Sequence, residues 1–205
     1  MWSGGTTVKI GGSVFLYSFG GFEYACPSFA CPHSVNEVFR ARVLNTGSID
    51  KWVKDTPLPD EPMTPTAVST LVGGKPTIYL MGGSPICCDG RWPTDRILRT
   101  TVAPDGKLGP WVASGKLPYK ASGIIAFARA GLLWVLGGSG DNWSPHDQVH
   151  QATIMSNGAL GSWQAHKPLP GPAAGTPHGF IGDHFYVVGT SKGGKTAVYY
   201  AYFSP

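Results

Sequence analysis

The stretch GALGSWQAHKPLP, from Gly158 to Pro170, decides the fold because the chain carries three versions of it. The others are GSIDKWVKDTPLP (Gly47 to Pro59) and GKLGPWVASGKLP (Gly106 to Pro118). Each reads Gly-x-Leu/Ile-x-x-Trp, with Leu-Pro beginning six residues after the Trp. The repeated tryptophans lie 59 and 52 residues apart: Trp52, Trp111 and Trp163. A period of about 50 residues is typical of repeat architectures, in which such residues belong to the scaffold.

A second series of short apolar runs ending in glycine stays in phase with the tryptophans. These runs are YSFGG, YLMGG, WVLGG and YVVGT, which end at Gly21, Gly83, Gly138 and Thr190. Each run is flanked by further strand patterns. Hairpin turns are expected before the Trp strands, at NTGS (45–48), PDGK (104–107) and SNGA (156–159). The sequence therefore predicts units of four antiparallel strands. The predicted strands are 67–71, 123–128 and 177–181; 14–19, 77–81, 132–136 and 184–188; and 37–44, 96–102, 148–155 and 197–203.

These repeats resemble the kelch family, in the form found in bacterial surface proteins, whose outer strand reads G-x-L-G-x-W and ends in L-P. The resemblance covers about residues 6–203, with Asp50 and Thr190 standing where the repeat has glycine. It implies an all-β propeller of four-stranded blades. It also implies binding more often than any one reaction, because a fold alone does not select a ligand.

We expect four blades, at about 12–59, 67–118, 123–170 and 177–205 plus 1–10. The fourth repeat has no Trp strand of its own, so the N-terminal segment with Trp2 is expected to complete that blade and close the ring. Closure would remove exposed sheet edges. The alternatives are a fragment of a six- or seven-bladed propeller, and half of an eight-bladed ring made by two chains.

Composition narrows the class of function. Gly 29 and Pro 18 suit many tight turns, and only 14% of the residues are charged. The net charge of +4 is scattered, so no nucleic-acid partner is expected. No apolar stretch reaches 18 residues, so no membrane insertion is expected, and Met1 to Gly4 begins no signal peptide. The chain is expected to be either cytosolic or the mature form of an exported protein.

The loops between the second and third strands differ among the blades. They span Phe22 to Asn36, Ser84 to Asp95 and Ser139 to Asp147, whereas the fourth blade has only Thr190 to Thr196. Three long loops beside one short loop would build a walled pocket on one face. Binding residues are commonly carried by loops on a rigid scaffold.

The composition of these loops favours carbohydrate as the ligand. Trp92 and Trp143 could stack on pyranose rings, or they could pack against the loop backbone. The polar candidates for hydrogen bonds to sugar hydroxyls are Asp89, Arg91, Asp141, Asn142 and His146.

All four cysteines lie in two of these loops: Cys26 and Cys31 in the first, Cys87 and Cys88 in the second. An even count suggests disulfides and an oxidising compartment, with three possible connectivities. One joins Cys26 to Cys31 and makes a strained vicinal bridge of Cys87 and Cys88, which would offer a flat plate to a ligand. The other two staple the loops together. A zinc site with His33 is a further alternative, although the spacing is unusual for zinc.

No nucleophile elbow, HExxH or phosphate-binding loop is present, so we expect no enzyme, no metal and no cofactor. The leading hypothesis is an extracellular or cell-surface binding propeller that recognises glycan through the loops of blades one to three. The alternative is a structural or adhesive module that binds a cell-surface protein within a larger assembly, or forms a homo-oligomer.

Overall fold

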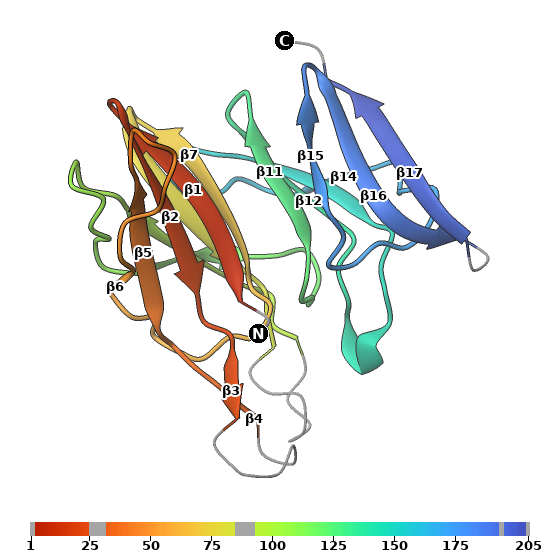
Figure 1. Ribbon diagram of the computed structural model, residues 1–205. Coiled ribbons are helices and arrows are strands. Elements are labelled where there is room, and N and C mark those ends of the chain that lie inside the picture. The colour runs from red at the N-terminus through yellow and green to blue at the C-terminus, as the bar shows by residue number, and fades with distance from the viewer. Residues whose placement is uncertain (1–2, 25–31, 85–92, 193–194, 204–205) are drawn as a thin grey trace.

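A computed structural model describes residues 3–24, 32–84, 93–192 and 195–203. The protein is all-β, and its four antiparallel sheets are arranged as a four-bladed β-propeller (Figure 1). This confirms the fold predicted from the repeats. The strands of blade one are β1 (Gly4–Ile10), β2 (Ser13–Phe19), β5 (Val38–Val43) and β6 (Val53–Lys54). Blade two has β7 (Thr66–Val72), β8 (Lys75–Met81), β9 (Arg96–Thr101) and β10 (Val112–Lys116).

Blade three consists of β11 (Ile125–Arg129), β12 (Leu132–Leu136), β13 (Val149–Thr153) and β14 (Gln164–His166). The described part of blade four has three strands, β15 (His178–Ile181), β16 (His184–Lys192) and β17 (Lys195–Tyr202). A short hairpin of β3 (Phe22–Tyr24) and β4 (Pro32–Ser34) extends the loop of blade one, and one 3-10 turn, Asp141–Trp143, lies in the loop of blade three.

The turn before each Trp strand has the same conformation in the three complete blades. Gly47, Gly106 and Gly158 have φ angles of 84°, 82° and 82°. This left-handed region favours glycine, which explains why the phrase begins with that residue each time. The repeated sequence is therefore a repeated turn as well as a repeated strand.

The N-terminal segment does not complete blade four, so that part of the prediction is wrong. Strand β1 pairs antiparallel with β2 from Gly4 opposite Phe19 to Ile10 opposite Ser13. Gly11 and Gly12 form a two-residue turn between these strands, with φ of 57° at Gly11. A short hairpin closes at a much smaller entropic cost than pairing across the ring, so the segment becomes the inner strand of blade one.

Hydrophobic clusters lie between consecutive blades. The first includes Phe19 and Leu80, the second Met81 and Leu133, and the third Phe127 and Phe185. Within the described ranges, none of these clusters joins blade four to blade one. The core of this propeller is thus three interfaces between neighbouring sheets.

The repeated tryptophans pack on the blade that precedes their own. Trp111 packs against the first cluster, and its indole Nε1 donates to the carbonyl of Thr56 at 3.2 Å. Trp163 packs against the second cluster and donates to the carbonyl of Lys116 at 2.7 Å. Trp52, in blade one, packs against none of the three clusters, and it is 47% exposed.

Candidate functional site

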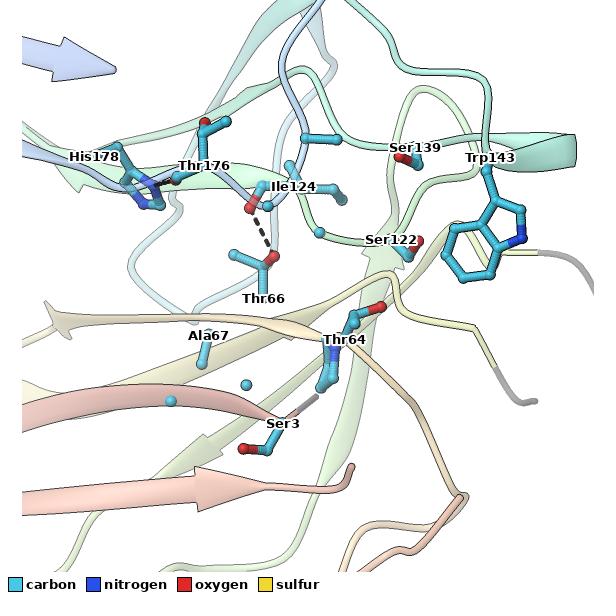
Figure 2. Close-up of a pocket in the computed structure, with 16 residues that line it drawn as sticks. Ser3, Thr64, Thr66, Ala67, Ser122, Ile124, Ser139, Trp143, Thr176 and His178 are labelled. Carbon is cyan, nitrogen blue, oxygen red and sulfur yellow. Dashed lines mark hydrogen bonds between the residues drawn. The ribbon is translucent and has the colours of Figure 1, made fainter. Parts of the chain in front are cut away.

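A pocket of about 640 Å³ lies where the inner strands of all four blades begin (Figure 2). The starts of β1 and β7, the residues just before β11 and the start of β15 form its walls, and the loop of blade three reaches it from one side. We call it the axial pocket. Its side chains with hydrogen-bonding or aromatic groups are Ser3, Thr64, Thr66, Ser122, Ser139, Trp143, Thr176 and His178.

Backbone hydrogen bonds hold the connections between the blades together at this pocket. Gly123 N–H donates to the carbonyl of Thr64 at 3.1 Å, and Gly175 N–H donates to the carbonyl of Gly123 at 2.8 Å. The three residues have φ angles of 48°, 58° and 60° in chain order. Three residues with left-handed backbones, one from each of three successive connections, are thus linked by hydrogen bonds along the pocket wall.

Thr64 is the exception among these three residues, because the other two are glycines. A side chain in the left-handed region costs roughly 1–2 kcal/mol relative to glycine. The Thr64 hydroxyl is buried and has no hydrogen-bond partner among the described residues. Strain of this kind concentrates at functional sites, so Thr64 is a candidate functional residue of the pocket wall.

Trp143 stands at the edge of the axial pocket, on the side opposite His178 in Figure 2. Its side chain is 49% exposed, and both Asn142 and Trp143 have left-handed backbones, with φ of 55° and 58°. Two consecutive non-glycine residues in this region form a tight turn that turns the indole toward the pocket. A half-exposed indole at a pocket edge offers a flat apolar surface to a ligand.

His178, on the opposite side, is oriented by its own connection. Its Nδ1 lies 2.9 Å from the carbonyl oxygen of Thr176. Because a carbonyl only accepts, Nδ1 carries the proton in the neutral ring and Nε2 is then an acceptor. The Thr176 hydroxyl is buried without a partner among the described residues, whereas Thr66 Oγ1 donates to the carbonyl of Ile124 at 2.8 Å.

The loop residues proposed from the sequence have different surroundings. Trp143 lines the axial pocket, whereas Asp141 and Asn142 are exposed in the same turn and are not part of its lining. His146 lies under the loop, with its ring 5.1 Å from that of Tyr119 and its Nε2 buried without a partner among the described residues. The other proposed residues lie outside the described ranges: Asp89, Arg91, Trp92, Cys87, Cys88, Cys26 and Cys31.

Thr64, Thr176 and His178 were not proposed from the sequence, which placed the pocket among the long loops. A signal for two of them was present, because Thr-Pro precedes the inner strand in both blade two and blade four. The pattern repeats at the same phase as the tryptophans, at Thr64-Pro65 and Thr176-Pro177.

Among the residues that the structure describes, no three His, Cys, Asp or Glu side chains come together as metal ligands would. The described residues also contain no helix with the length and apolar character needed to cross a membrane.

Comparisons with known proteins support the fold alone. No family model matches the chain, and no curated protein matches it. Among solved structures, the chain is similar to the one titled "Structure of YjhT", with a TM-score of 0.64 and 19% sequence identity. The match covers 89% of this chain and 57% of that chain, so this protein spans little more than half the length of its structural neighbour. The kelch resemblance stays a prediction.

Proposed function

We propose that this protein is a non-catalytic binding propeller that recognises glycan in the axial pocket. The observation that carries the proposal is the half-exposed Trp143 indole at the edge of a pocket whose walls present hydroxyl groups. A sugar has both an apolar face of C–H groups and a rim of hydroxyls. An aromatic ring and several short polar side chains match these two features.

The charge of the pocket supports a neutral ligand. Among the described residues, the lining includes no Asp, Glu, Lys or Arg, and His178 is its one titratable group. The volume of about 640 Å³ falls in the range of pockets for small ligands. Uncharged hydroxyls at Ser122, Ser139 and Thr176 would exchange hydrogen bonds with sugar hydroxyls without the desolvation cost of an ion.

The unpaired hydroxyls support a polar ligand. Thr64 and Thr176 both place a buried oxygen without a protein partner at the wall of the pocket, among the residues described. Buried polar groups nearly always find a partner, so each hydroxyl would gain one if its side chain rotated toward a ligand in the pocket. Thr64 carries its hydroxyl at a left-handed backbone position, where a glycine would be less strained.

A second candidate function, adhesion to a protein, is favoured by the outer face of blade four. Ile181, Tyr200 and Tyr202 are 73%, 70% and 61% exposed. The rings of His184 and Tyr202 lie 5.3 Å apart on this face. Clustered exposed apolar side chains mark surfaces that bind proteins, including further copies of the same chain. Either function agrees with the cell-surface or extracellular location that we propose from the cysteine content.

The test is a glycan array probed with three forms of the protein. The wild type should retain a defined set of glycans, and Trp143→Ala should lose them while its circular dichroism and thermal unfolding stay unchanged. Asp141→Ala is the matched control, because Asp141 belongs to the same turn but does not line the pocket. An array that the wild type leaves empty, or on which Trp143→Ala binds as the wild type does, overturns the proposal.

A further inference from the structure

A second cavity, of about 560 Å³, lies between blade three and blade four near the outer edge of the ring. One wall is the stretch from His166 to Pro170, which ends the third repeat. The other wall comes from β16 and β17, including Tyr199 and Ala201. We call this space the outer cavity.

At the two preceding interfaces, a tryptophan occupies the corresponding place. Trp111 of blade two reaches the backbone of Thr56, just ahead of Leu58-Pro59 in blade one. Trp163 of blade three reaches the backbone of Lys116, just ahead of Leu117-Pro118 in blade two. At the third interface the equivalent backbone ahead of Leu169-Pro170 lines the outer cavity, and no described residue of blade four provides the tryptophan.

A second contact is repeated in the same way. Tyr17 of blade one donates to the carbonyl of Gly106 at 2.6 Å, and Tyr79 of blade two donates to the carbonyl of Gly158 at 2.8 Å. Both acceptors are the first residue of the Trp phrase in the following blade. Trp134 holds the corresponding place in blade three, three residues before the Gly-Gly pair, and it lines the outer cavity.

Among the residues that the structure describes, none pairs with the edge of blade four at the same place. The third strands of the other blades, β5, β9 and β13, each pair with a fourth strand, whereas β17 is the last strand of its sheet in the described chain. The hydroxyl of Tyr199, a residue of β17, is buried with no partner among the described residues. An edge strand presents a row of backbone donors and acceptors to which a further strand can pair.

We infer that β17 and the outer cavity together bind a β-strand that carries the phrase Gly-x-Leu-x-x-Trp and is supplied by a polypeptide segment other than residues 1–205 of the same molecule. This strand pairs antiparallel with β17, its tryptophan fills the outer cavity against Leu169, and its first glycine offers a carbonyl near Trp134. Main-chain pairing would supply affinity and the cavity would supply specificity for tryptophan, as in other cases of strand addition. This inference is independent of glycan binding at the axial pocket.

The experiment uses a peptide that has the chemistry of the missing strand. The peptide has the sequence of residues 156–170, SNGALGSWQAHKPLP. In the folded chain, this segment fills the equivalent place between blades two and three. It should bind the full chain in isothermal titration calorimetry, and its addition should slow hydrogen exchange of the β17 amides. The same peptide with Trp163→Ala should bind roughly tenfold more weakly or worse, because a buried tryptophan anchor dominates such contacts.

A pair of protein variants supplies the control. Ala201→Arg places a long charged side chain in the cavity from an exposed position, so it should abolish peptide binding without unfolding the chain. Ile181 is also exposed but does not line the cavity, so Ile181→Arg should bind as the wild type does.

If the chain forms dimers that the peptide dissociates, a second copy donates the strand and the inference holds. The inference is overturned if the wild type does not bind the peptide, if the alanine peptide binds equally well, or if Ala201→Arg binds as Ile181→Arg does.

Discussion

Tyr79 of blade two donates a hydrogen bond of 2.8 Å to the carbonyl oxygen of Gly158, in the turn of blade three. The two residues are 79 positions apart in the chain, which is more than one repeat, and the contact is buried. Burial is the main cause that raises the pKa of the Tyr79 phenol above its ordinary value, so the phenol stays protonated as a donor. Tyr17 and Gly106 repeat the contact one interface earlier, at 2.6 Å.

These two contacts predict different costs for the same substitution. Tyr17→Phe removes the side-chain donor of the Gly106 carbonyl, whereas the Gly158 carbonyl accepts from both Tyr79 and Ser114 Oγ, the latter at 3.1 Å. Leaving a buried carbonyl unsatisfied costs about 1–3 kcal/mol, and losing one of two donors costs about 1 kcal/mol or less. Urea unfolding should therefore show a larger loss for Tyr17→Phe. A larger loss for Tyr79→Phe would contradict this reading of the interface.

The repeated tryptophans are predicted to contribute unequally to stability. Trp111→Ala leaves a cavity against the first hydrophobic cluster and removes the hydrogen bond to Thr56, so it should cost roughly 3 kcal/mol. Trp52→Ala changes a side chain that is 47% exposed and should cost under about 1 kcal/mol. Thermal unfolding of both variants measures the difference. Equal losses would show that Trp52 packs on something that the described chain does not provide.

The sequence was enough to predict the blades, because the repeat fixes the phase of every strand and turn. It failed at ring closure, where Trp2 and the strand at 7–10 looked like the missing outer strand of blade four. The competing signal was the Gly11-Gly12 turn, which makes a local hairpin with β2. The two-residue loop favours pairing of β1 with β2 over pairing of the same segment with blade four. The repeat spacing of about 50 residues does not show which of these two partners the segment chooses.

The candidate site could be predicted only in part, for a related reason. Trp143 stood out because it interrupts the repeat. Thr64 and Thr176 belong to the connections between blades, where the sequence looks like scaffold. Thr64 is marked by its φ angle, and both residues are marked by unpaired hydroxyls among the described residues, which only the packed structure shows.

Thr64→Gly is predicted to separate stability from binding. Glycine relaxes the left-handed backbone at this position, so the free energy of unfolding should stay the same or rise by up to about 1 kcal/mol. The same change removes a pocket hydroxyl, so the affinity for glycan should fall. Calorimetric titration together with thermal unfolding measures both effects. A variant that is less stable and binds with unchanged affinity would show that Thr64 serves the fold alone.

His150 is predicted to make the folded state sensitive to mild acid. Burial, and then the neighbouring His166, lower its pKa below the ordinary value of 6.5, and its Nδ1 is buried without a partner among the described residues. The unfolded chain therefore takes up this proton first, so the contribution of His150 is complete above about pH 6.5 and is lost as the pH falls toward its folded pKa.

His150→Gln should flatten this part of the pH dependence, measured as the unfolding midpoint between about pH 7 and about pH 5. His178→Gln is the matched control, since His178 is an exposed histidine of blade four. A wild-type curve that rises on acidification, or a His150→Gln curve that falls as steeply as the wild type, would contradict the assignment.

Glycan binding in the axial pocket is tested most directly by nuclear magnetic resonance mapping of a glycan that binds the protein on the array. If the glycan binds there, the amide shifts should gather at residues 3–5, 64–67, 122–124 and 174–178, together with the Trp143 indole. All four blades would then contribute to one site. Shifts confined to the tyrosines of the blade-four face, with residues 64–67 unaffected, would contradict it.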